Sequence, residues 1–149
     1  MNRPYVHILA AMSIDGRIHA ARGASSRIFD AMATDAGMGY QAKARAESDA
    51  ILVGINTVIA DDPRFETSGS PLMPVILDSH GRIPLESRLM RGRASETLIC
   101  VAEGAPQARV DAIRAAGAEV FVSGDRQCDL SAVLGELAAR GVRRLLVEG

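Results

Sequence analysis

Short apolar runs, each bounded by polar residues or glycine, recur along the whole chain. Runs of this length are typical of strands buried in a sheet. We expect strands at Tyr5–Ala11, Ile51–Val53, Pro74–Leu77, Glu96–Val101, Glu119–Val122 and Arg143–Val147. The last three alternate with helical patterns, and a strand–helix–strand order brings successive strands side by side in parallel. The pattern therefore predicts an α/β fold with a mostly parallel central sheet.

The clearest helical pattern follows Asp129, which suits the N-cap position. Apolar side chains recur after it at the spacing of one helix face, namely Leu130, Val133, Leu134, Leu137 and Ala138. Gly141 then ends the pattern. A second helix is predicted from Pro106, at the first helical position, to Gly117.

A third helix is predicted at Asp30–Glu47, with Asp30 as its N-cap. Gly37 and Gly39 each weaken it by about 1 kcal/mol relative to alanine, so a break is expected there. Arg17–Ile28 lacks periodicity and is predicted to be mostly loop. Pro84 and the arginines that follow it, including Arg88, Arg91 and Arg93, indicate a solvated surface loop.

Composition narrows the class of protein. At 149 residues the chain is expected to form one domain, and its net charge of −1 argues against a nucleic-acid-binding surface. The chain has no Trp and only five Tyr and Phe residues, so a stacking platform for bases is not expected. No apolar run approaches the roughly 20 residues of a membrane span. We expect a soluble, cytoplasmic protein.

Several kinds of site are not expected. The three histidines have no ligand spacing with cysteine or carboxylates, so we predict no metal centre. Cys100 lies in an apolar strand and is interpreted as a buried hydrophobic residue. The chain has no G-x-G-x-x-G, Walker A or G-x-S-x-G pattern.

Polar residues gather directly after the strand Ile51–Val53. Beyond Gly54, Asn56, Thr57, Asp61 and Asp62 lie within one or two turns of each other, and Pro63 then stops any helix. Ligands of open α/β sheets bind at the carboxyl ends of strands. The segment Arg45–Pro63 is therefore the first candidate for a functional site.

The segment Arg45–Pro63 reads R-A-E-S-D-A-I-L-V-G-I-N-T-V-I-A-D-D-P, and it occurs with A-M-S-I-D-G-R, D-S-H-G-R-I-P and L-L-V-E-G elsewhere in the chain. Together, in this order, these motifs resemble the reductase domain of riboflavin biosynthesis. The resemblance implies a dihydrofolate-reductase-like, three-layer fold. It also implies NADPH-dependent reduction of the ribosylamino group of a pyrimidine 5′-phosphate to ribitylamino. We expect no deaminase domain before it, as in the stand-alone reductases, which it resembles more than the bifunctional enzymes.

The resemblance also implies residue roles. Expected cofactor-binding residues are Ala11, Arg27, Thr57, Asp61, Ser79 and Gly149, and expected substrate-binding residues are Ser25, Arg45, Phe65 and Glu148. No catalytic group is evident; Glu148 is a candidate proton donor, with water as the alternative. The partners implied are the small-molecule substrate and a second copy in a homodimer. The chain is expected to be a single reductase domain, 1–149, without the family's C-terminal strands.

The residues by themselves leave other interpretations open. Arg45 also suits a surface position at a helix C-terminus, Ser25 and Arg27 suit an ordinary polar loop, and Asp15 suits a turn. Ser68 stands where the family has its phosphate-binding arginine. Three alternatives follow: a reductase of another pterin or pyrimidine, an inactive nucleotide-binding module, and a flavodoxin-like domain that shares only the βαβ order.

Overall fold

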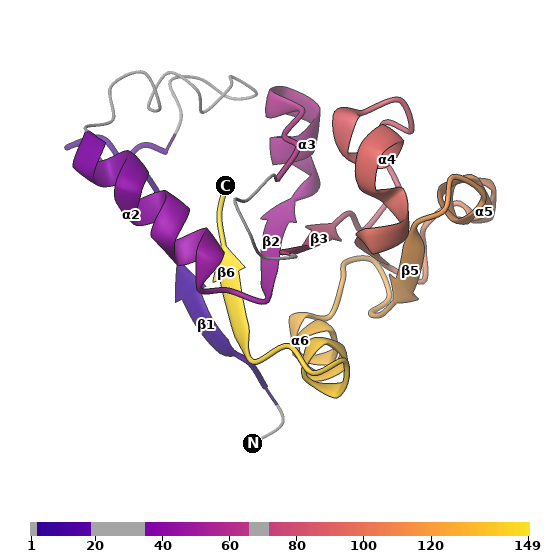
Figure 1. Cartoon of the computed structure of the whole chain (residues 1–149). Coiled ribbons are helices and arrows are strands. Elements are labelled where there is room, and N and C mark those ends of the chain that lie inside the picture. Colours follow the sequence, from indigo (N-terminus) through magenta and orange to yellow (C-terminus); the bar gives the residue numbers. More distant parts are fainter. Residues whose placement is uncertain (1–2, 19–34, 66–71) are drawn as a thin grey trace.

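The computed structural model describes residues 3–18, 35–65 and 72–149. Within these ranges six parallel strands form one sheet in the order β1-β6-β2-β3-β4-β5 (Figure 1). The strands are β1 (Tyr5–Ile8), β2 (Ala50–Gly54), β3 (Met73–Leu77), β4 (Leu98–Val101), β5 (Glu119–Val122) and β6 (Arg144–Val147). The helices are α2 (Asp35–Ala46), α3 (Ile55–Asp61), α4 (Arg88–Arg93), α5 (Gln107–Ala115) and α6 (Leu130–Ala139), with a 3₁₀ turn at Ala94–Glu96. The predicted α/β class and parallel sheet are confirmed.

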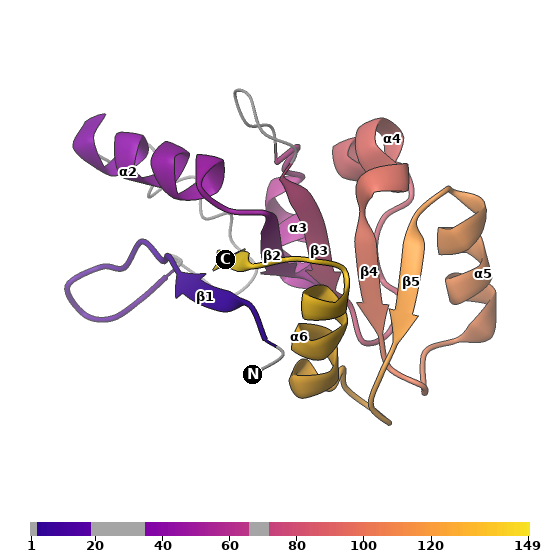
Figure 2. The ribbon, with the colours of Figure 1, turned by 60° about the horizontal axis from the view of Figure 1, so that its bottom comes forward.

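Helices cover both faces of the sheet, which gives three layers (Figure 2). Apolar residues of α2, α3, α4 and α5 pack with Ile51, Val53 and Ile76 in one buried cluster. Residues of α6 pack with Ala50 and Leu52 in a second cluster on the opposite face. Because alternate residues of β2 are buried on both faces, β2 is a central strand, and its uninterrupted apolar run follows from that position.

The first strand is shorter and more exposed than its apolar sequence predicts. It ends at Ile8, which pairs with Val147 near the end of β6, so the chain beyond has little strand left to pair with. Tyr5 and Ile8 are 72% and 71% exposed. Among the described strands, β1 lies at the edge of the sheet and has β6 as its single neighbour.

The prediction of a surface loop after Pro84 is wrong in part, because the short helix α4 forms there. Ser87 caps α4 through its hydroxyl, which accepts a hydrogen bond from the amide of Met90. Leu89 and Met90 are buried and belong to the first cluster. A helix of six residues is too short to show apolar periodicity, so the sequence pattern did not reveal it.

The other predicted helices are present with small shifts. Asp129 caps α6, as predicted, by accepting hydrogen bonds from the amides of Ser131 and Ala132. Pro106 flanks α5 as its N-cap, one position before the place predicted for it. The predicted cap Asp30 lies outside the described residues, and the described part of that helix is α2.

In the described part of the chain, every helix is too short or too polar to cross a bilayer. The same residues include no cluster of three or more His, Cys, Asp or Glu side chains that would suit a metal ion.

Candidate functional site

The strand order reverses direction at the β6–β2 boundary. Strands β3, β4 and β5 extend to one side of β2, whereas β6 and β1 lie on the other side. In open α/β sheets, ligands bind in the crevice outside the carboxyl ends of the strands at such a reversal. In Figure 1, the last residues of the chain emerge from β6 at this point, with α2 on one side and α3 on the other.

Glu148, directly after β6, is held at this edge of the sheet by two side chains of α2. Arg45 donates from Nε to Oε1 at 2.9 Å and from Nη2 to Oε2 at 2.6 Å. Gln41 donates from Nε2 to Oε2 at 3.2 Å. Gln41 and Arg45 are four residues apart, so they share one face of α2. The carboxylate of Glu148 is only 10% exposed, so the pair with Arg45 is less screened by water than a surface pair.

This environment bears on the predicted proton donor. Three N–H groups point at the Glu148 carboxyl, and a carboxylate can only accept hydrogen bonds. The arrangement therefore presents Glu148 as a fixed acceptor and negative charge. Water, the alternative proton source, stays a prediction.

Next to Glu148, the backbone passes close to the first turn of α3. Gly149 has φ +141°, and a Cβ built on it would lie 3.0 Å from Thr57 Oγ1. A side chain at this position would crowd the threonine hydroxyl. Glycine at this position therefore leaves the threonine hydroxyl uncrowded.

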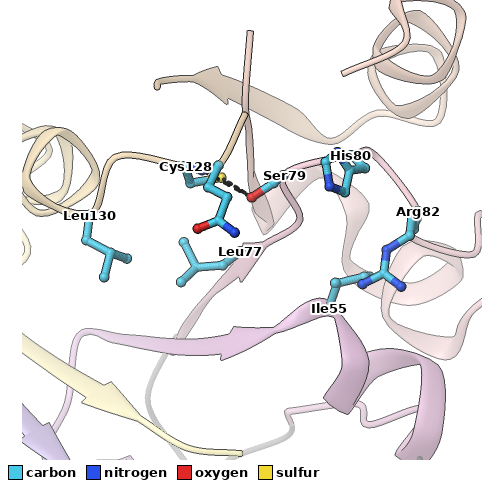
Figure 3. A pocket seen from close by; sticks show the side chains of 8 residues that line it. Ile55, Leu77, Ser79, His80, Arg82, Cys128 and Leu130 are labelled. Atoms are coloured by element: carbon cyan, nitrogen blue, oxygen red, sulfur yellow. Dashed lines mark hydrogen bonds between the residues drawn. The ribbon is translucent and has the colours of Figure 1, made fainter. Parts of the chain in front are cut away.

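A cavity of about 350 Å³ continues along the edge of the sheet beyond α3. Figure 3 shows its lining: Leu77 and Leu130 form an apolar side, while Arg82 lies at the opposite side. Ser79 and Cys128 close it between them, where the Cys128 amide donates to Ser79 Oγ at 3.1 Å. An apolar wall faced by a guanidinium is suited to a flat ring that carries a negatively charged group.

The turn that forms one side of this cavity is fixed from beneath. Asp78 is fully buried, and its Oδ2 accepts a hydrogen bond from the amide of Ile83 at 2.7 Å. Arg109, on α5, donates to the carbonyl oxygens of Gly81 and Ile83 at 2.7 and 2.6 Å. Gly81 has φ +65°, a conformation that favours glycine. The segment Ser79–Arg82 is therefore a rigid turn.

Several of the predicted site residues meet at the same edge of the sheet. Arg45 pairs with Glu148, Gly149 passes close to Thr57, and Ser79 lies in the adjoining cavity. Sequence reasoning separated a substrate group from a cofactor group. Arg45 and Glu148 meet on the α2 side, whereas Thr57 and Ser79 lie on the α3 side, and the roles of the two groups stay predictions.

Other predicted residues lie elsewhere. Ala11 is exposed in the segment after β1, and Asp61 is the last residue of α3. Phe65 is only 4% exposed and packs in the first core cluster, and its predicted substrate contact stays a prediction. Ser25 and Arg27 lie outside the described residues, as does Ser68.

Sequence reasoning missed Gln41, His80 and Arg82 as site residues. Gln41 had a signal, because it precedes Arg45 by one helical turn. His80 and Arg82 follow the predicted residue Ser79 directly, but their direction depends on the turn that Asp78 and Arg109 hold.

Cys100 shows the environment predicted for it. Burial raises the pKa of its thiol to about 12, which leaves it protonated and unreactive near neutral pH.

Comparison with known proteins identifies relatives of this chain. The model of the RibD C-terminal domain matches residues 4–149. The 2,5-diamino-6-ribosylamino-4(3H)-pyrimidinone 5′-phosphate reductase of Aquifex aeolicus is 36% identical over 153 residues, covering 100% of this chain and 68% of that protein. The protein of the same name from Methanothermobacter thermautotrophicus is 40% identical over 153 residues, covering 99% and 68%.

A solved structure shares the fold. RibD of Acinetobacter baumannii superposes with a TM-score of 0.76 and 26% identity, and the match covers 99% of this chain but 40% of that one. These relatives are named reductases or RibD proteins, which favours the predicted enzyme class over a flavodoxin-like binding domain. The chain belongs to the family of the RibD C-terminal domain.

Proposed function

We propose that this protein uses NADPH to reduce the ribosylamino group of a pyrimidine 5′-phosphate to ribitylamino. When bound, NADPH supplies the hydride that forms the new C–H bond at C1′ of the ring-opened imine, while the C=N electron pair moves to nitrogen and takes up a proton. The names of the relatives support this substrate class. The observation that carries the proposal is Glu148, held by Arg45 at the carboxyl edge where the strand order reverses.

The residues of the chain fit such a cofactor. The cavity beside α3 offers an apolar wall of Leu77 and Leu130 for an adenine ring, with Arg82 opposite for a phosphate. The first turn of α3 and Gly149 lie between this cavity and Glu148. Ser79, Arg82 and the first turn of α3 would hold such a dinucleotide.

On the α2 side the chain binds and orients the substrate. Glu148 can accept hydrogen bonds from sugar hydroxyls, and Arg45 keeps this carboxylate in one orientation. Orientation of this kind is the main contribution a protein makes when the cofactor supplies the reactive group. Ser25 and Arg27 stay predictions as substrate and cofactor contacts, and so does Phe65.

The test is NADPH oxidation by the purified chain with the ribosylamino pyrimidine phosphate. We expect turnover with this substrate and none with a dihydropterin. Replacement of Arg45 by Met should lower kcat/KM by roughly 30- to 1,000-fold, because truncating one partner of a partly buried charge pair costs about 2–4 kcal/mol. Arg91→Met, on exposed α4 surface, is the matched control and should leave kcat/KM unchanged.

The alternatives give different outcomes. NADPH oxidation with the dihydropterin alone would support a reductase of another substrate and overturn the proposal. Tight binding of NADPH without turnover of either compound would support an inactive nucleotide-binding module. A homodimer in the cytoplasm stays a prediction, and sedimentation of the purified chain tests the dimer.

A further inference from the structure

Gln41 contacts the same carboxylate as Arg45, through the NH₂ group of its amide and not through its carbonyl oxygen. Its Nε2 donates to Glu148 Oε2 at 3.2 Å. The two Arg45 nitrogens that face Glu148, Nε and Nη2, both donate to its carboxylate. Within the described chain, no donor reaches the amide oxygen of Gln41.

The orientation of the amide follows from its partner. A carboxylate accepts hydrogen bonds, so the NH₂ group and not the carbonyl must face Glu148. The Gln41 carbonyl oxygen then points away from Glu148. Because Gln41 is only partly buried, this oxygen can accept a hydrogen bond from a ligand bound beside α2.

We propose that Gln41 is a further substrate-binding residue, whose carbonyl oxygen accepts a hydrogen bond from a hydroxyl of the substrate's sugar chain beside Glu148. This inference rests on the proposed function, because it takes the sugar chain of the ribosylamino pyrimidine phosphate as the ligand. Glu148 and Gln41 together form a pair of acceptors at fixed spacing. A chain of neighbouring hydroxyls matches such a pair, whereas a flat pterin ring has no hydroxyl chain to offer it.

Gln41→Met is the first variant for the test, since methionine keeps the length of the side chain and removes both polar groups. Gln107→Met is the matched control. Like Gln41, Gln107 lies on a helix and donates from Nε2 to a carboxylate. Its partner is Asp111, at 2.8 Å, and both residues lie on α5. Binding of the ribitylamino pyrimidine phosphate is measured by calorimetry, so the test does not depend on turnover.

We expect Gln41→Met to weaken binding of this compound by about tenfold, as for the loss of one or two hydrogen bonds. NADPH affinity and the unfolding midpoint should match those of Gln107→Met. Compounds that each lack one sugar hydroxyl identify the contact: one of them should bind the wild-type chain about five- to tenfold more weakly, yet bind Gln41→Met as well as the complete compound does.

Two results would overturn the inference while leaving the reductase activity in place. In the first, Gln41→Met binds the complete compound as tightly as Gln107→Met does. In the second, binding weakens but every hydroxyl-deficient compound loses the same factor in both proteins, which would show that Gln41 acts only through Glu148. If the wild-type chain fails to bind the compound at all, the proposed function fails first.

Discussion

Arg93 offers a strong test of the physical argument, because its sequence context predicted a solvated side chain and the structure shows a structural one. Its Nη1 donates to the carbonyl of Phe65 at 2.9 Å, and its Nη2 donates to the carbonyl of Leu72 at 2.7 Å. The same guanidinium pairs with Glu96 at 2.7 Å. One side chain of α4 thus ties together the two residues that flank 66–71, and it is only 19% exposed.

The expected cost of Arg93→Met follows from these contacts. Hydrogen bonds from a charged donor contribute about 1.5–3 kcal/mol each, and partial access of water to the freed carbonyls reduces the total. The pair with Glu96, whose side chain is 56% exposed, adds less than about 1 kcal/mol. We therefore expect a loss of about 2–4 kcal/mol in the free energy of unfolding, or roughly 5–15 °C in Tm for a chain of this size.

Urea unfolding followed by circular dichroism measures this loss. Arg91→Met on the same helix is the control, because Arg91 is exposed and has no partner in the described chain, and its effect should stay within about 0.5 kcal/mol. Arg93→Lys should recover only part of the loss, since a single ammonium cannot span both carbonyls. If Arg93→Met and Arg91→Met unfold with the same free energy, the reasoning is refuted.

Three further predictions follow from other parts of the fold. A thiol reagent should modify one cysteine of the native chain and both after unfolding, because burial raises the pKa of Cys100 to about 12; two fast native thiols would contradict its burial. Gly124→Ala should destabilise the chain by about 2 kcal/mol or more, since φ is +76° and a Cβ would collide with a backbone carbonyl of the same turn. Gly135→Ala should instead stabilise the chain by up to about 1 kcal/mol, because Gly135 lies within α6 and a Cβ there meets no neighbouring atom. Urea unfolding compares the two variants. The Arg140 guanidinium holds the pKa of Glu119 below its ordinary value of 4.5, so the pair stabilises the fold above about pH 4.5 and this contribution is lost as the pH falls through the lower folded-state pKa. Because Glu119 is 60% exposed, Glu119→Gln should cost at most about 1 kcal/mol at pH 7, and a cost that persists at about pH 3 would contradict the sign.

The elements that sequence reasoning predicted well are those whose signals are local. The Asp129 cap and the apolar face of α6 lie within one segment, and the helix forms where both indicate. The central strands β2, β3 and β4 are short apolar runs that contact the core on both faces. Each signal depends only on the residue's own neighbours in sequence, so pattern and propensity suffice.

The elements that it missed depend on distant contacts. Helix α4 is stabilised by a cap and by two side chains that pack in a cluster whose buried residues come from seven other helices and strands. The exposure of β1 follows from its place at the edge of the sheet, which no pattern within Tyr5–Ala11 encodes. The burial of Phe65 likewise depends on contacts with core residues that are distant in sequence.

The sequence by itself determined the fold class, the order of the strands and the longer helices along the chain, and the family motifs that mark the site. Only the tertiary structure decided which of those residues meet. Arg45 and Glu148 are 103 positions apart, and they pair because β6 inserts between β1 and β2, below α2. Gln41 joins them because the same crossing presents one face of α2 to the end of β6. A contact of this kind is a property of strand order and packing, and it cannot be read from either segment alone.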